Sequence, residues 1–306
     1  MTAETFLPFH ADEVAAQTLA GVSMRRAPIR PHMPDQHREF FPLLPYIFTA
    51  TLDGHGWPMA SVLSGPHGFV TSPDPATLRI AALPRADDPA AAGFAAGGDI
   101  GLVGIDLTTR RRNRVNGRIV KIDDGITVGV TQSFGNCPQY IQVRAPLPHP
   151  VAAKVAVETM ARLDADARAL IAGADTFFVG SRGRADLGAA GGLDMSHRGG
   201  RPGFVGIEDD TLVIPDFSGN RFFNTLGNLL GDPRAGLLFV NFATGDLLQL
   251  QGTVTIDWQP ALAGPRGTQR IWRVAVERVW RRRAAFPFRW SFGEFAPTTL
   301  ATGTWA

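Results

Sequence analysis

The sequence is poor in the residues that mark secreted, metal-binding and membrane proteins. Cys137 is the single cysteine among 306 residues, so no intrachain disulfide and no site built from several cysteines can form. Lys121 and Lys154 are the only lysines. No stretch approaches the ~20 consecutive apolar residues of a membrane span, and the N-terminus lacks the pattern of a signal peptide. These absences predict a cytoplasmic protein with no membrane partner.

Common enzyme motifs are also missing. No GxGxxG opens a helix after a strand, no P-loop, HExxH or EF-hand pattern is present, and the histidines lack metal-ligand spacing. We therefore expect no metal site. Two arginine clusters, at 110–114 and 281–283, fit either solvated surface arginines or an anion site. The aromatic residues expected in a nucleic-acid groove are absent, so we expect no nucleic-acid partner.

What the sequence does contain is an internal repeat. Several short strings return in the same order, and this indicates a duplicated unit. Two such units can pack as a pseudo-dimer, and ligands often bind at such a junction, so we expect the functional site there. The matching pairs, all 135 positions apart, are Gly68-Phe69-Val70 with Gly203-Phe204-Val205, Gly101-Leu102-Val103 with Gly236-Leu237-Leu238, Ser61 with Ser196, and Gly117 with Gly252.

Strand alternation and short turns predict two antiparallel β-barrels, which makes the fold class mainly β with short helices (α+β). Helices are expected at 11–22, 34–44, 136–143, 151–172 and 220–230. The predicted domains are an N-terminal helical segment (1–45), a first barrel unit (46–145), a helical linker (146–174), a second barrel unit (175–285) and a C-terminal tail (286–306).

Four polar segments lie at the ends of predicted strands: 108–117, 132–140, 195–200 and 216–224. In the last of them, Ser218 is expected to cap the helix that follows, and a helix N-terminus with polar neighbours suits a phosphate. An ordinary helix cap explains the same pattern. Likewise, His197 also fits a surface residue, and Cys137 also fits a small buried hydrophobe.

These segments, together with the repeat, resemble the pyridoxamine 5′-phosphate oxidase-like FMN-binding split-barrel proteins in their tandem form. The resemblance covers most of residues 6–260. The strings at 132–141 and 215–228 are fairly specific for this family. The other resembling stretches are 33–41, 65–70, 110–117 and 196–205. The resemblance implies two tandem split β-barrels with FMN, or the related FAD, in the cleft between them.

The resemblance also implies which residues bind the flavin. One principal site is expected, with the phosphate on the second unit and the ring facing the first, because Asp87 and Asp88 stand in the first unit's strand-to-helix turn. The family's phosphate-binding lysine has no counterpart here. The phosphate and ribityl candidates are Ser196, His197, Arg198, Ser218, Asn220, Arg221 and Asn224, and the candidates near the ring are Gln132, Ser133, Asn136, Cys137 and Gln139.

The function implied by the resemblance is an FMN-dependent oxidoreductase that acts on a small-molecule substrate or takes electrons from an external donor. The alternative is a non-catalytic protein that binds flavin or haem, and His197 would then be the axial haem ligand. Haem is the less favoured of the two cofactors. A barrel pair without any cofactor is a third interpretation. A homodimer could contribute part of the cleft.

Overall fold

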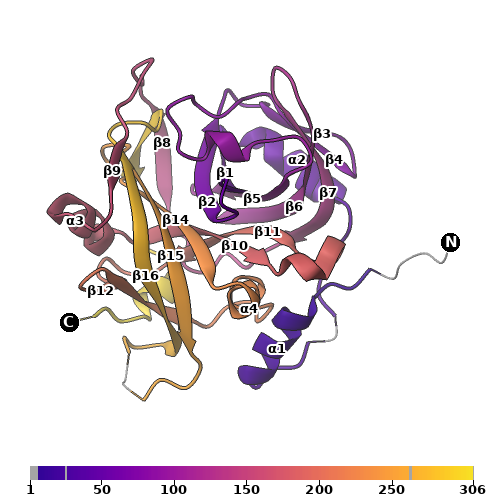
Figure 1. The fold of residues 1–306 in the computed structure, drawn as a ribbon. Coiled ribbons are helices and arrows are strands. Elements are labelled where there is room, and N and C mark those ends of the chain that lie inside the picture. Colours follow the sequence, from indigo (N-terminus) through magenta and orange to yellow (C-terminus); the bar gives the residue numbers. More distant parts are fainter. Residues whose placement is uncertain (1–5, 25, 262–263, 306) are drawn as a thin grey trace.

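The computed structural model describes residues 6–24, 26–261 and 264–305, and β-strands dominate it (Figure 1). Strands account for 43% of the residues and helices for 16%, so the predicted fold class, mainly β with short helices in two split β-barrels, is confirmed. No helix in the described part of the chain has the length and apolar character needed to cross a bilayer.

Two large antiparallel sheets make up the two units. The first contains β1 (Tyr46–Leu52), β2 (Pro58–Ser64), β3 (Val70–Asp74), β4 (Thr77–Ile80), β5 (Asp99–Asp106), β6 (Arg111–Ile122) and β7 (Ile126–Gly135). The second contains β10 (Thr176–Gly183), β11 (Gly192–Gly199), β12 (Gly206–Glu208), β13 (Thr211–Phe217), β14 (Arg234–Val240), β15 (Leu247–Asp257) and β16 (Thr268–Arg282).

Both sheets have the same strand order. The first runs β2-β1-β5-β6-β7-β4-β3 and the second runs β11-β10-β14-β15-β16-β13-β12. The pairing register shifts at the same step in both, just before Gly117 in β6 and just before Gly252 in β15. Gly68 and Gly203 have φ angles of +85° and +86°, which favour glycine. The strings that repeat in the sequence therefore mark repeated backbone geometry.

The described residues contain four clusters of buried apolar side chains: one inside each unit, one between the units, and a small one around Phe9, Phe134 and Phe222. Strands β1 and β10 contribute to two clusters each, because successive side chains point to opposite faces. Ile47 packs inside the first unit and Phe177 inside the second, whereas Phe48 and Phe178 face the junction. Phe48 and Phe178 stack there with ring centroids 3.5 Å apart and 14° between the planes.

The repeated glycines let the units approach closely. A Cβ on Gly101 in β5 would lie 2.7 Å from the backbone of Asp194, and a Cβ on Gly236 in β14 would overlap the carbonyl oxygen of Pro58. Each glycine thus faces the edge strand of the other unit, β11 or β2. The junction has no room for a side chain at either position.

We predict that Gly236→Ala destabilises the protein by about 1–3 kcal/mol, because the added methyl group forces the two backbones apart. Thermal denaturation of the variant and the wild type measures this. Gly54→Ala is the matched control, since a Cβ at Gly54 meets nothing within 4 Å. Equal melting temperatures for the two variants would contradict the close approach.

The helices are short. The α-helices are α1 (Ala11–Leu19), α2 (Asp35–Phe40), α3 (Ala165–Gly173), α4 (Asn224–Gly231) and α5 (Pro297–Leu300). The 3₁₀ turns are η1 (Phe41–Leu43), η2 (Ala91–Gly93) and η3 (Ala185–Ala190). The helix predicted at 136–143 is wrong, because this stretch is a loop in which Tyr140 has a φ of +61°. The predicted domain boundaries remain predictions; the strands of the two large sheets lie within residues 46–135 and 176–282.

The helical linker expected at 146–174 is helical only at its end. It contains the end of β8 (Arg144–Pro148), an irregular stretch, β9 (Glu158–Met160) and then α3. The helix predicted at 151–172 is therefore wrong for residues 151–164. Strand β9 pairs with β16, so tertiary pairing overrides the helical preference of this segment.

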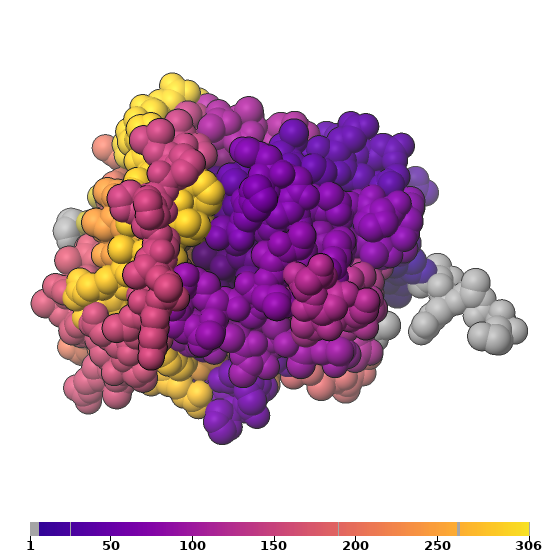
Figure 2. All heavy atoms as spheres, turned by 90° about the horizontal axis from the view of Figure 1, so that it is seen from above, coloured from indigo at the N-terminus to yellow at the C-terminus, as the bar shows by residue number. Residues whose placement is uncertain are grey.

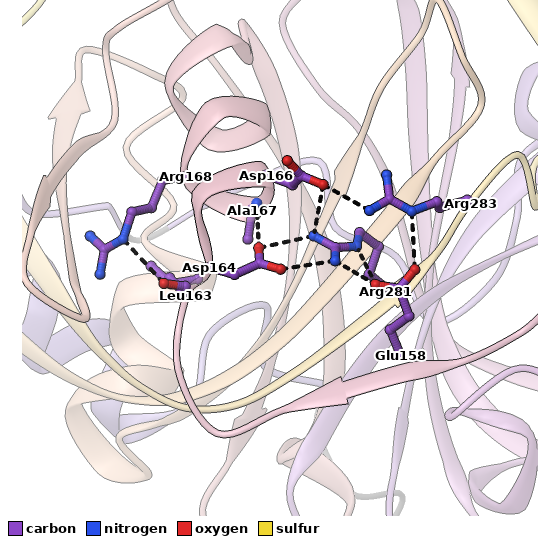
Figure 3. A network of polar contacts seen from close by, with 8 residues as sticks. All are labelled: Glu158, Leu163, Asp164, Asp166, Ala167, Arg168, Arg281 and Arg283. Atoms are coloured by element: carbon purple, nitrogen blue, oxygen red, sulfur yellow. Dashed lines mark hydrogen bonds and ion pairs between the residues drawn. The ribbon is translucent and has the colours of Figure 1, made fainter.

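Ion pairs join the connection between the units, residues 144–173, to the second arginine cluster (Figure 3). Arg281 pairs with Glu158 and, at 2.8 Å, with Asp164, which also caps α3. Arg283 pairs with Glu158 at 3.0 Å and with Asp166 at 2.8 Å. The chain's own carboxylates thus neutralise Arg281 and Arg283, and these two arginines stabilise the connection and form no open anion site.

The C-terminal tail is part of the junction between the units. Strand β17 (Phe288–Phe292) pairs with β8, and Phe286, Phe288 and Trp290 join the apolar cluster between the units. Figure 2 shows yellow C-terminal residues between the indigo-to-purple first unit and the pink connection. The aromatic residues of the tail therefore seal the junction.

Candidate functional site

A pocket lies between the two units, where β6 and the loop after β7 face β11, β13 and the loop before α4. Its cavity volume is about 130 Å³, and the pocket opens to solvent. The junction between the units thus carries a cleft, where the sequence repeat predicted the functional site.

The structure brings most of the predicted site residues to this pocket. They come from three separate stretches of the chain, and both units contribute. The predicted residues that line the pocket are Ser196, His197 and Arg198 on β11, Asn220, Arg221 and Asn224 around the start of α4, and Asn136, Cys137 and Gln139 after β7.

Three predicted residues do not line the pocket. Gln132 accepts a hydrogen bond from Asn116 at 3.1 Å, and Ser133 is fully buried with its hydroxyl 2.7 Å from Nδ1 of His37. The backbone carbonyl of Ser218 accepts a hydrogen bond from the Tyr140 hydroxyl at 2.9 Å. Local contacts hold the Gln132 and Ser133 side chains away from the lining, and Ser218 is exposed outside it.

The helix expected from Asn220 begins four residues later, at Asn224. Arg221 and Phe223 have φ angles of +62° and +61°, which a right-handed helix cannot contain. Phe223 occupies the N-cap position without a side-chain hydrogen bond, so the predicted cap by Ser218 is wrong. Asn220 and Arg221 therefore reach the pocket from a loop with left-handed backbone.

Arginines dominate the polar lining, and one acidic side chain, Asp216, joins them. Arg198 and Arg270 both pair with Asp216, at 2.7 and 2.9 Å. Arg112 and Arg114 come from the cationic hairpin, which the sequence singled out without assigning it to the site. Arg112 and Arg114 are two positions apart on a strand, so their side chains share one face. This spacing is the sequence signal that could have assigned both arginines to the site. The lining arginines are Arg112, Arg114, Arg198, Arg221 and Arg270.

Burial, and then the charge of Arg198, lower the pKa of Arg112 to about 10. Burial, and then the charges of Arg112 and Arg198, lower the pKa of Arg114 well below its usual value, although Arg114 pairs with Asp194. Among the described residues, Nε of Arg112 and Nε of Arg114 have no hydrogen-bond partner. An anion bound here would reduce the repulsion between the guanidinium groups and accept hydrogen bonds from their unpartnered N–H groups.

His197 adds a neutral hydrogen-bond donor. Arg112 donates to Nδ1 of His197 at 2.9 Å, and a guanidinium can only donate, so the imidazole proton is on Nε2. Nε2 is buried and has no partner in the described parts of the chain. Burial, then the charges of Arg112 and Arg198, lower the pKa of His197 well below its usual value. His197 therefore offers one N–H to an acceptor on a ligand.

The N-terminal helix packs against α4, which begins at the pocket. Asn224 donates to the carboxylate of Glu13 on α1, and the backbone N–H of His10 donates to the same carboxylate at 2.9 Å. His10 Nε2 lies 2.8 Å from Oδ1 of Asn228 on α4. Burial raises the pKa of Glu13, and the charge of His10 partly offsets this rise. Helix α1 thus fixes both α4 and Asn224.

Stability should fall as the pH is lowered from about 7.5 to about 5, partly because of His197. The folded state keeps His197 neutral, whereas the unfolded state binds a proton below a pH of about 6.5. The contribution is therefore fully present above that pH and is lost below it. We expect the loss at pH 5 to be about 1–2 kcal/mol larger in the wild type than in His197→Asn. Urea denaturation at both pH values measures this, and equal losses would contradict a neutral His197.

No protein-family model and no curated protein sequence matches the chain. Among solved structures, HupZ from Group A Streptococcus is 14% identical, with a TM-score of 0.30, and the match covers 41% of this chain and 98% of HupZ. An FAD-binding protein from Mesorhizobium loti is 11% identical, with a TM-score of 0.27, over 42% of this chain and 97% of that protein.

The Bacillus subtilis inhibitor of motility covers more of this chain. That match is 8% identical, with a TM-score of 0.21, over 83% of this chain and 89% of the inhibitor. Similarities this weak assign neither a family nor a function. The function must therefore be inferred from the pocket itself.

The lining fits a ligand with an anionic end and a flat end. Guanidinium groups and the His197 N–H supply donors for phosphate oxygens. Tyr140 and Phe217, whose ring centroids are 5.6 Å apart, form an aromatic wall, and the amides of Asn136 and Gln139 lie in the same pocket. A flavin nucleotide has both ends. For a haem iron, His197 would need a free lone pair on Nε2, where the proton lies.

Proposed function

We propose that the pocket binds FMN and that the protein is a flavin-dependent oxidoreductase acting on a small molecule. One observation carries the proposal: buried guanidinium groups with unpartnered N–H atoms converge with a neutral imidazole N–H, also unpartnered among the described residues, in a pocket between the two units. Such a donor set favours an acceptor-rich anion, and a flavin phosphate is one.

Each part of the lining has a role in this proposal. Arg112 and Arg114 donate their unpartnered Nε–H groups to the phosphate, and His197 donates from Nε2. Arg198, which shares Asp216 with Arg270, adds positive charge beside them. Asn136 and Gln139 hydrogen-bond the polar edge of the ring, and the aromatic side chains exclude water from its face. Bound FMN supplies the hydride or electron transfer. A guanidinium beside the ring stabilises negative charge that develops there.

We expect purified protein, given excess FMN and then desalted, to retain the visible absorption bands of oxidised flavin. Addition of NADH, NADPH or a chemical reductant should bleach these bands, and oxygen or a substrate should restore them. Flavin that binds but does not turn over would identify a carrier and remove the oxidoreductase from the proposal. A Soret-type band would indicate haem, and no retained chromophore would contradict both cofactors.

The matched variants are Arg198→Gln and Arg162→Gln. Arg198→Gln removes one guanidinium from the pocket but leaves Asp216 paired with Arg270, so the fold should be kept. Loss of this positive charge beside the phosphate should weaken FMN binding about 10- to 100-fold. The Arg162 side chain is 86% exposed and is outside the pocket lining, so its variant should bind like the wild type. Equal affinities for all three proteins, measured by flavin fluorescence quenching, would contradict the assignment of Arg198.

A further inference from the structure

The repeated topology defines a second location, related to the pocket by exchange of the two units. In the pocket, β11 of the second unit faces β6 and the end of β7 of the first. If each strand is replaced by its counterpart in the other unit, the equivalent arrangement is β2 of the first unit facing β15 and the end of β16 of the second. The packing agrees with this exchange, because β2 contacts β14 and β15 as β11 contacts β5 and β6. A counterpart of the pocket is therefore expected beside β2.

Strand pairing identifies the residues at this second location. Gly101 in the first sheet and Gly236 in the second occupy equivalent positions. Two residues are equivalent when they lie the same number of paired strands and the same number of positions from these glycines. The two edge strands, β2 and β11, follow from their pairing with β1 and β10. The counterparts of Ser196, Arg114 and Asn136 in the pocket are Ser61, Gln249 and Arg282 at the second location.

These counterparts surround one carboxylate of the chain itself. Ser61 donates to Asp88, Gln249 donates to it at 3.1 Å, and Arg282 lies 2.9 Å from its Oδ2. The backbone N–H of Ala90 donates at 2.9 Å. The side chains of Asp88 and Arg282 are only 2% and 1% exposed, so solvent anions do not reach this arginine. The chain itself thus supplies the donors that hold the carboxylate.

Asp88 also comes from the corresponding segment of its unit. It lies in the connection between β4 and β5, and the connection between β13 and β14 carries Asn220 and Arg221 to the open pocket. In the second unit this connection leads into α4, where Thr225 donates to Ser196 at 2.8 Å, as Asp88 accepts from Ser61 in the first. Ser196 and Arg114 also contact Asp194, on β11 itself, so the two locations share a backbone arrangement and differ in where the chain places its carboxylate.

We propose that Asp88 is a built-in anion that fills the counterpart of the pocket. The chain then has one open anion pocket, beside β11, and one site beside β2 that its own carboxylate closes. Without the Asp88 side chain, the second site takes a small free carboxylate such as formate, held by Ser61, Gln249 and Arg282. The proposal concerns the anion alone, so it stands whether or not the open pocket binds flavin.

The test is chemical rescue of Asp88→Ala in the full chain. Removal of one partner of a buried ion pair should lower the melting temperature by about 10 °C. Sodium formate, compared with sodium chloride at equal ionic strength, should restore at least half of this loss in a concentration-dependent manner. The wild type should gain far less from formate. An equal gain in both proteins would show binding elsewhere and would overturn the proposal.

A double variant keeps the test decisive if Asp88→Ala does not fold. Asp88→Ala combined with Arg282→Leu removes both charges of the ion pair. Loss of both charges destabilises the fold less than loss of one. It should fold, and formate should not stabilise it beyond the wild type, because the cation is gone. The proposal is overturned if Asp88→Ala keeps the wild-type melting temperature, or if neither the double variant nor formate restores the fold.

Discussion

The direct contact between the two units at Phe48 and Phe178 is the constraint on which the rest of the structure depends. These counterpart rings stack on each other, so β1 and β10 are buried on both faces. An aromatic pair of this kind contributes about 0.5–1.5 kcal/mol beyond the area it buries. The contact also brings the edge strands β2 and β11 onto the other unit, where Gly101 and Gly236 give them room. The open pocket and the closed site beside β2 both follow from this one packing arrangement.

The two sites show how differently charged side chains can occupy a repeated backbone. In one, Arg282 is buried against Asp88, and the chain provides both ions. In the other, Arg112 and Arg198 lie near each other, and burial and repulsion lower the pKa of Arg112 to about 10. A buried cation without a full set of partners is costly unless an anion joins it. On the two proposals above, an internal anion marks the structural site and an external anion marks the binding site.

Much of the fold could be predicted from the sequence because its signals are local and repeated. Alternating strands, the turn after Leu52 and the glycines at the junction each leave a pattern in the sequence. The cluster from Ser196 to Arg198 was recognisable because consecutive polar residues at a strand end are unusual in a buried sheet. The general location of the site followed from the repeat itself.

The remaining features depend on contacts that no local pattern records. Tyr140, Arg221 and Phe223 have left-handed backbone, which non-glycine residues adopt rarely, so helices were predicted in their place. Residues 158–160 form a strand because β16 lies beside them. Gln132 and Ser133 lie outside the pocket because neighbouring side chains, such as His37, bind them. For residues 158–160, Gln132 and Ser133, a partner distant in sequence decides where they lie.

The two sites also differ in how they stabilise the fold. A ligand that binds only the folded state adds stability that grows with its concentration. Asp88, in contrast, is present in every molecule, so its contribution to stability is constant. Under the proposed function, the open pocket couples the stability of β6, β11 and the loop before α4 to the amount of anionic ligand, whereas the Asp88 site contributes the same stability with and without a ligand.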